Sequence, residues 1–306
     1  MSTPTPLLSL VLIVYNMNRE APRTIRSLIP SYQNVDANLY EIVLVENGSS
    51  GPLDRELVRK LSPNLRYFYI HEADPSPAAA VNFGVAQSRG AFVGISIDGA
   101  RIFSPGIIKY SLIAFKAYAN PVISTLGWHL GPDIQGRSMQ NGYDQDVEDK
   151  LLQSINWPED GYRLFEISVL AGSSVDGWFQ PMAESNCVML KKETFNQLHG
   201  FDERFNLPGG GLVNLDFYKR ACQHPQTRLV TLLGEGTFHQ IHGGVSTGVS
   251  PEKNVKLWKI FEAQYIKLRG MGFSKPSVET DYLGRVPREA LPSLMGSAKS
   301  AYDNAG

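Results

Sequence analysis

The chain has 306 residues, of which 42% are hydrophobic and 19% are charged, and its formal net charge is -1 at pH 7. That length is enough for one large globular domain or two small ones. A net charge near zero produces no long-range field that would attract nucleic acid, so we expect no nucleic-acid partner. The two cysteines, Cys187 and Cys222, are too few for a disulfide framework, and we expect free thiols in a reducing cytoplasm.

The apolar runs of the sequence are short. None approaches the ~18 unbroken apolar residues that a membrane-spanning helix needs. The N-terminal apolar run has no basic segment before it, so it is predicted to be a buried strand and not a signal peptide. We therefore expect a cytoplasmic protein, with peripheral association with a membrane left open.

Strand and helix patterns alternate from the N-terminus to residue 126. Continuous apolar runs rich in branched residues are typical of strands that are buried on both faces of a parallel sheet. Such runs predict strands at 7–14, 41–45, 66–70, 91–97 and 122–126, with helical patterns between them near 25–29, 53–61, 77–88 and 107–118. The alternation predicts an α/β fold with a doubly wound, mostly parallel sheet flanked by helices.

Polar residues stand where three of these predicted strands end. Asn16 follows Val14, the pair Glu46 and Asn47 follows the second strand, and Asp98 with Gly99 follows the fourth. Ligands of doubly wound sheets bind beyond the carboxyl ends of the strands. We therefore expect these residues to line one crevice.

The regular pattern stops at Trp128. Residues 128–180 are predicted to be an irregular insertion with a short helix near 146–155. Beyond it, the sequence predicts strands at 186–190 and 228–233, a loop at 239–244, and helices at 192–198, 214–222 and 251–269. The end of the chain contains Gly, Pro, Ser and scattered charges, so we expect a C-terminal helical extension followed by a loosely ordered tail.

Several stretches resemble the family 2 glycosyltransferases, which have the GT-A fold, and they occur in the family's order. They are SLVLIVYNMNREAPRTIRSL, EIVLVENGSS, SPAAAVNFGVAQSRGAFVGISIDGA, GFDERF, LDFYKRA and FHQIHGG, within residues 7–245. The resemblance implies a GT-A-type sheet in which residues 1–127 bind a nucleotide sugar. Residues 128–248 would then form the acceptor side of the same domain, and residues 249–306 a C-terminal helix and tail.

The resemblance also implies an activity. Family members move a sugar from a nucleoside-diphosphate sugar to an acceptor, commonly in cell-surface polysaccharide synthesis. For this chain we expect a UDP-linked donor and, as acceptor, a hydroxyl of a glycan or of a lipid-linked saccharide. The residues expected to bind the donor are Val14, Asn16, Glu46, Asn47, Asp98, Gly99 and Arg101. An ionised Glu46 would accept a hydrogen bond from the imide N–H of uracil. The alternative is that Glu46 and Asn47 only cap a turn.

A divalent metal is implied by the resemblance but is put in question by one departure. The family's Asp-x-Asp motif reads Asp-Gly-Ala at residues 98–100, so Asp98 remains and a second ligand for Mn²⁺ or Mg²⁺ is missing. His239 and His242 match a late His motif, in which one histidine would contact the metal or the diphosphate. Arg101 either neutralises the diphosphate without a metal or is a surface charge.

A second departure from the family pattern concerns the general base. An inverting transferase needs a base for the acceptor hydroxyl, and the family supplies it from an acidic pair just before an Asp-hydrophobic-x-x-Arg pattern. Here that pattern begins at Asp216, but the pair falls on Val-Asn at 213–214. The remaining candidates are Glu184 and Asp216, and the alternative role of Asp216 is an i,i+4 ion pair with Arg220. The alternative function is a sugar-nucleotide-binding protein that has lost catalysis.

Overall fold

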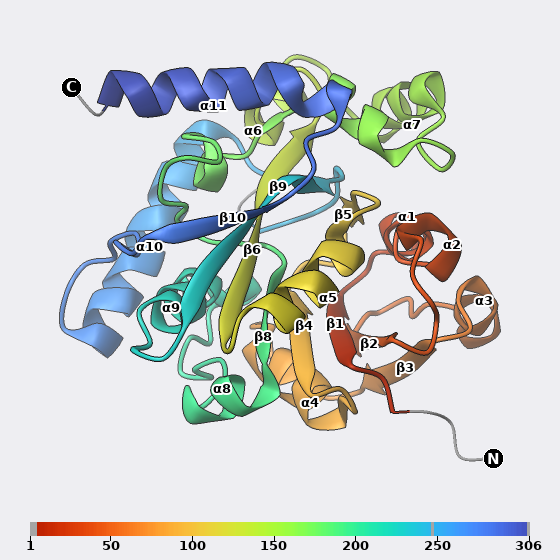
Figure 1. Cartoon of the computed structure of the whole chain (residues 1–306), viewed down its shortest axis with the longest axis horizontal. Coiled ribbons are helices and arrows are strands. Elements are labelled where there is room, and N and C mark those ends of the chain that lie inside the picture. The colour runs from red at the N-terminus through yellow and green to blue at the C-terminus, as the bar shows by residue number, and fades with distance from the viewer. Residues whose placement is uncertain (1–4, 246–247, 305–306) are drawn as a thin grey trace.

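The computed structural model describes residues 5–245 and 248–304. Within those residues, the strands form one mixed sheet in the order β10-β9-β6-β8-β4-β1-β2-β3, with β5 paired to β9 and β7 paired to β6. Figure 1 shows this sheet running through the centre of the molecule, with helices on both of its faces. The predicted α/β class and helix-flanked sheet are confirmed.

The N-terminal part of the sheet is parallel. Its elements alternate as β1 (Leu8–Val14), α1 (Glu20–Arg26), α2 (Pro30–Gln33), β2 (Tyr40–Asn47), α3 (Arg55–Leu61), β3 (Leu65–Ile70), α4 (Ala78–Gln87) and β4 (Phe92–Ser96). Every residue of β1 and β2 is buried, because alternate side chains pack on α4 from one face and on α1 and α5 (Ile107–Ala117) from the other. Burial on both faces explains the unbroken apolar runs.

The second part of the sheet is mixed. Its strands are β5 (Arg101–Phe103), β6 (Pro121–Leu130), β8 (Val188–Lys191) and β9 (Arg228–His239); β8 is antiparallel to β4 and β6, and β6 is parallel to β9. β6 and β9 continue beyond their predicted ends because Trp128 and Phe238, both buried, stack on each other there. His239 is therefore the last residue of a strand and not part of a loop.

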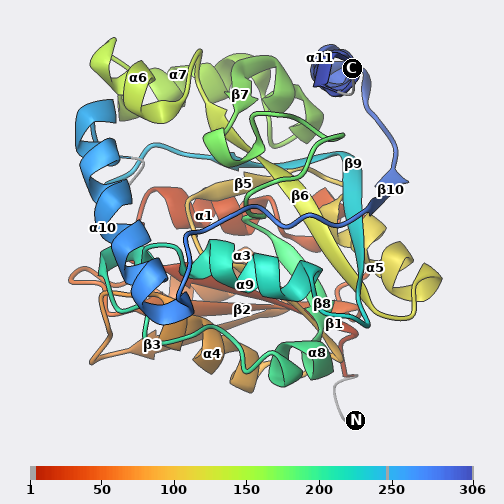
Figure 2. The same cartoon turned by 90° about the vertical axis from the view of Figure 1, so that its left-hand side faces the viewer.

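The insertion after β6 has regular pieces of its own. It contains α6 (Gln135–Gln140), the predicted helix as α7 (Gln145–Ile155), and β7 (Ser168–Leu170), which pairs with β6. Trp157 and Trp178 are both buried in the main core. These two side chains fix the insertion to the domain beside the carboxyl end of β6. Figure 2 shows α6 and α7 above the sheet.

The expectation of a loosely ordered tail is wrong. After α8 (Lys192–Gln197), α9 (Val213–Cys222) and the predicted helix α10 (Pro251–Arg269), the chain forms β10 (Thr280–Gly284) and α11 (Leu291–Asn304). β10 pairs in parallel with β9, in the register Thr280 to Leu229. The pairing depends on a distant strand, so local composition could not reveal it. Among the described residues no helix is both long and apolar enough to cross a membrane.

A substitution at Gly90 would test the close packing of backbone at the start of β4. A Cβ added there would lie 2.8 Å from the backbone nitrogen of Ser9 and 2.9 Å from the carbonyl oxygen of Leu7. Gly90→Ala should therefore lower the free energy of unfolding by about 1 to 3 kcal/mol, because the backbone of β1 must shift. Urea titration measures the change. Gly172→Ala, where an added Cβ meets no atom within 4 Å, is the control. Equal stability of the two variants would contradict this account.

Candidate functional site

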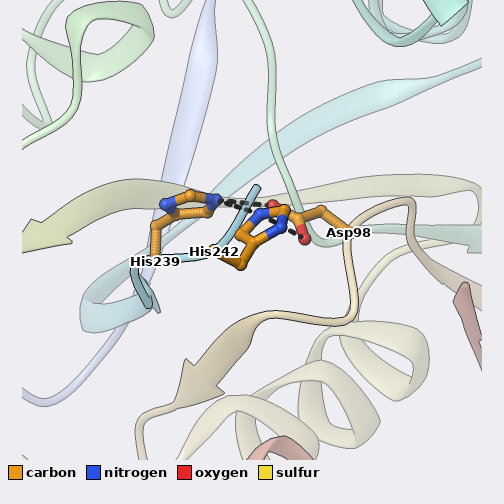
Figure 3. A group of neighbouring side chains, drawn as sticks. All are labelled: Asp98, His239 and His242. Atoms are coloured by element: carbon orange, nitrogen blue, oxygen red, sulfur yellow. Dashed lines mark hydrogen bonds and ion pairs between the residues drawn. The ribbon is translucent and has the colours of Figure 1, made fainter. Parts of the chain in front are cut away.

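Asp98 lies beside His239 because of how β5 pairs with β9. Asp98 follows β4, and three residues later Arg101 starts β5 directly opposite His239, the last residue of β9. This antiparallel pairing carries the end of β4 across to the end of β9. The result is a distance of 2.9 Å between Asp98 Oδ2 and His239 Nε2 (Figure 3).

His242 completes the group from the segment that follows β9. Its Nε2 lies 3.6 Å from Asp98 Oδ1 and 3.1 Å from His239 Nε2. All three ligand atoms fall within 4.8 Å of one another. The residues predicted as a metal set are thus together, at the carboxyl end of β4. The family's second motif position, Ala100, is packed in the apolar core and takes no part.

The orientation of His239 suits a cation site. His239 Nδ1 lies 2.5 Å from Gln135 Oε1, and this contact holds the ring with Nε2 toward Asp98 Oδ2, 2.9 Å away. Burial lowers the pKa of His239 to about 4, despite the opposing effect of Asp98. One carboxylate and two imidazole nitrogens facing one another form a donor set that suits a divalent transition metal.

Asp98 and His242 also affect the charge of each other. Burial acts to raise the pKa of Asp98, but His239 and His242 outweigh it and hold that pKa well below its usual range. Burial acts to lower the pKa of His242, but Asp98 outweighs it and raises that pKa. Asp98 is therefore an anion at neutral pH and is ready to accept a cation.

Arg101 is a buried cation at the same site, so the surface-charge alternative is wrong. Its side chain is only 6% exposed, and its Nε lies 3.5 Å from Asp98 Oδ2. Its Nε and Nη1 have no hydrogen-bond partner among the described residues. Burial lowers the pKa of Arg101, while Asp98 and Glu184 act in the opposite direction. Unpaired buried N–H groups are costly, and an anionic ligand would satisfy them.

The predicted donor-binding residues have different surroundings. Glu46 is fully buried, and its carboxylate accepts hydrogen bonds from Leu53 N at 3.0 Å and from the hydroxyl of Tyr67. These contacts correspond to the turn-capping alternative, because both carboxylate oxygens accept hydrogen bonds from within the protein. Asn47 likewise donates to the carbonyl of Asp74 at 3.1 Å. Glu46 and Asn47 therefore both have hydrogen-bond partners within the protein.

The turn after β1, in contrast, is exposed to solvent at Asn16. Asn16 is exposed and has a left-handed φ of 52°, and its Oδ1 accepts a hydrogen bond from Ser50 N at 2.9 Å. The strand before it ends at Val14, whose Cγ1 would clash with a Cβ added at Gly99. Gly99 thus lets the segment after Asp98 approach β1 closely. Asn16, Val14 and Gly99 therefore share the edge of the sheet at which Asp98 lies.

Two residues of the insertion were missed by the sequence analysis. Gln135 orients His239, as described above. Glu148 is fully buried in α7, accepts a hydrogen bond from Ile241 N at 2.7 Å and lies 3.2 Å from the guanidinium of Arg19. Burial raises the pKa of Glu148 to about 7, against the effects of these contacts. Glu148 thus connects the turn after β1 to the segment that carries His242, and no local motif signals that role.

The match to known sequences covers the first part of the chain. Residues 9–98 match the family described as "Glycosyl transferase family 2", and this segment runs from β1 to Asp98. This segment of the chain is therefore similar to family 2 glycosyltransferases, in agreement with the motifs seen in the sequence. A comparison with curated protein sequences gives no significant match.

The chain as a whole resembles solved structures that have the GT-A fold. S. aureus TarS 1–349 in complex with UDP-GlcNAc is 13% identical, with a TM-score of 0.51, and the match covers 85% of this chain and 66% of that one. A further S. aureus TarS structure has a TM-score of 0.50 and 14% identity, over 85% of this chain and 39% of that one. The chain thus spans less than two thirds of either TarS chain.

A third structure is matched over nearly the whole of this chain. The mannosyltransferase PcManGT from Pyrobaculum calidifontis, in complex with GDP-Man and Mn²⁺, is 14% identical with a TM-score of 0.51. The match covers 98% of this chain and 73% of that one. At such low identity these likenesses establish the fold alone.

The two predicted base candidates have different surroundings. Asp216 is buried and forms ion pairs with Arg220 at 2.8 Å and Arg269 at 2.6 Å. The pair with Arg269 attaches α10 to α9, and the pair with Arg220 is the i,i+4 alternative considered from the sequence. Glu184 is partly exposed, and its Oε2 lies 2.6 Å from Asn214 Nδ2. A carboxylate from outside α9 therefore lies against the position at which the family carries its acid.

Glu148 offers a test of how the insertion positions His242. Glu148→Gln keeps the size of the side chain but turns an amide toward Arg19, so the Ile241 segment should loosen. We expect Mn²⁺ affinity to fall about 10-fold, within the range seen when groups supporting metal ligands are removed. Calorimetric titration with MnCl₂ measures it. Asp146→Asn, at an exposed position of the same helix, should leave the affinity unchanged. An unaltered affinity in Glu148→Gln would refute the positioning role.

Proposed function

We propose that the protein transfers a sugar from a UDP-sugar to a hydroxyl of a glycan or of a lipid-linked acceptor. The observation that carries the proposal is the meeting of Asp98, His239 and His242 at the carboxyl ends of the strands of a sheet whose first part is similar to family 2 glycosyltransferases. The similar TarS and PcManGT structures hold UDP-GlcNAc and GDP-Man, which are both nucleotide sugars. Cell-surface polysaccharide synthesis is the biological setting that we propose from the family.

The donor diphosphate would lie between the turn after β1 and Asp98. Asp98, His239 and His242 would hold Mn²⁺ or Mg²⁺. When bound, the cation neutralises the negative charge that develops on the departing diphosphate. Arg101 adds a second positive charge, whose unpaired N–H groups suit phosphate oxygens. In this proposal the cation and Arg101 together balance the negative charge of the diphosphate, although the family's second carboxylate is absent at Ala100.

Glu184 is the base in this proposal. The acceptor oxygen forms a bond to the anomeric carbon while the bond from that carbon to the diphosphate breaks, and the acceptor proton passes to Glu184. Asn214 neither gives nor takes this proton. It donates to Glu184 Oε2 and to the carbonyl of Ser185 at 3.3 Å, and thereby orients the carboxylate. Asp216 is left out, because two arginines neutralise it.

Ligand binding is tested first by thermal shift. UDP with MnCl₂, at a hundredfold excess over Kd, should stabilise the protein by about 2.7 kcal/mol and raise Tm by several degrees. In Asp98→Asn and His242→Gln the part of the shift that depends on Mn²⁺ should vanish, while UDP without metal retains the contacts of Arg101. Arg204→Gln, at an exposed arginine away from the site, is the control. If UDP, GDP and dTDP all left Tm unchanged, the nucleotide-sugar proposal would fail.

Catalysis is tested by release of UDP from UDP-GlcNAc and UDP-glucose. Glu184→Gln should lower the rate about 10² to 10⁴-fold with UDP affinity unchanged, because only proton transfer is lost. Glu193→Gln, just beyond the other end of β8 at an exposed position, should be active. Full activity in Glu184→Gln would rule out this base.

The same assay separates the alternative function. Ala100 and Asn214 favour a sugar-nucleotide-binding protein without catalysis, since both stand where the family has carboxylates. Such a protein would bind UDP in the thermal-shift experiment but release none from either donor with Mn²⁺, Mg²⁺ or chelator present.

A further inference from the structure

Gly127 of β6 lies beneath two polar side chains at the edge of the candidate site. It precedes His129 by two residues, and His129 is the partner of His239 where β6 pairs with β9, so Gly127 faces the same side of the sheet as His239. A Cβ added at Gly127 would lie 3.2 Å from Asn186 Nδ2 and 3.7 Å from Arg101 Nη1. The lack of a side chain at Gly127 therefore lets an amide and a guanidinium approach the same point above β6.

Asn186 is a buried polar residue whose side chain has no partner within the protein. The residue is only 5% exposed, and its amide has no hydrogen-bond partner among the described residues. Neither amide atom is sealed from solvent, in contrast to Nε and Nη1 of Arg101. A buried polar group without a partner is costly. The side chain of Asn186 is thus free to meet a ligand beside the unpaired N–H groups of Arg101.

The segment that carries Asn186 also carries Glu184. Two contacts fix this segment: Asn214 Nδ2 donates to Glu184 Oε2 at 2.6 Å, and Ser185 Oγ accepts a hydrogen bond from the backbone nitrogen of Thr125 in β6 at 3.0 Å. The carboxylate of Glu184 also acts on the pKa of Arg101, against the effect of burial. Asn186 therefore lies beside Arg101 and two residues from the carboxylate that we propose as the base.

We propose that Asn186 binds a hydroxyl of the donor's sugar ring and so helps to select the donor sugar. This inference rests on the proposed function, in which the anomeric carbon is bonded to the diphosphate at Asp98 and Arg101 and is attacked by the acceptor oxygen that Glu184 deprotonates. The sugar ring then spans the distance between those groups, and Asn186 is the uncharged polar side chain that the structure places there.

The chemistry of an amide suits this role. A primary amide offers donors on its nitrogen and an acceptor on its oxygen, and a sugar hydroxyl also both donates and accepts. The match holds whichever way the amide is turned. A site built to hydrogen-bond a hydroxyl discriminates against sugars that lack it or present it in another direction, because its buried polar group is then left unpaired. Asn186 is accordingly a residue for specificity and takes no part in proton transfer.

Asn186→Leu tests this role, because leucine has the same branched shape and no hydrogen-bonding atom. The measurement is calorimetric titration with UDP, UDP-GlcNAc and UDP-glucose, each with MnCl₂. For whichever UDP-sugar the parent protein binds more tightly, the ratio of its Kd to the Kd of UDP should rise about fivefold, as expected for one lost hydrogen bond. The Kd of UDP should not change. Asn196→Leu, at an exposed position of α8, should leave both constants as in the parent.

Gly127→Ala tests the same contact without altering Asn186. The added Cβ, at 3.2 Å from Asn186 Nδ2, pushes the amide aside by a few tenths of an ångström, whereas Arg101 Nη1 stays in ordinary contact at 3.7 Å. The same Kd ratio should therefore rise about twofold, because the hydrogen bond is lengthened and not removed. Melting temperatures close to that of the parent show that the variants are folded, and Gly127→Ala decides alone should Asn186→Leu not fold.

The results that overturn this inference differ from those that overturn the proposed function. An unchanged Kd ratio in both variants, or equal losses of affinity for UDP and for the UDP-sugar, would sink the role of Asn186 while UDP binding by the parent protein still supports a nucleotide-sugar site. A parent protein that bound neither UDP nor a UDP-sugar would remove the proposed function and this inference together.

Discussion

The contact between Asp98 and His239 is the interaction on which the site depends. The two residues come from strands that are not neighbours in the main sheet, because β8 and β6 lie between β4 and β9. The short strand β5 overcomes this separation by pairing Arg101 with His239. Asp98, three residues earlier, is thereby carried to within 2.9 Å of the His239 ring. The same pairing buries Arg101, so the β5–β9 pairing brings together an anion, two imidazoles and a guanidinium.

The sequence predicted the parts of this arrangement that follow from local patterns. Buried strands such as β1 and β2 are apolar on both faces, so their runs and the polar residues at their ends are visible without a structure. Asp98, His239 and His242 could be named because Asp98 keeps the first position of the Asp-x-Asp motif and both histidines of the late His motif are present. The role of Glu46 could not be settled in this way, since an acid at a strand end is compatible with ligand binding and with the bond that it accepts from Leu53.

The parts that escaped prediction depend on contacts between distant segments. Gln135 and Glu148 act on His239 and on the Ile241 backbone from an insertion with no periodic pattern, and either residue would look like an ordinary polar surface residue in the sequence. β10 forms because β9 offers an unpaired edge about fifty residues earlier in the chain, and pairing of that kind is not encoded in local composition. Propensity is a weak guide wherever tertiary pairing determines the conformation.

The two departures from the family pattern have related physical explanations. At position 100 the side chain faces the apolar core, where an ionised carboxylate would be costly, and in the proposed metal site the nitrogens of His239 and His242 would be the ligands instead. At position 214 an amide replaces the acid, yet it holds Glu184 at 2.6 Å. In both places a group from a different chain segment takes the position of the missing carboxylate: two imidazoles beside Asp98, and the carboxylate of Glu184 beside Asn214. What has to persist in such a site is the balance of charge around the diphosphate and a proton acceptor near the nucleophile, and different segments of the fold can supply each of them.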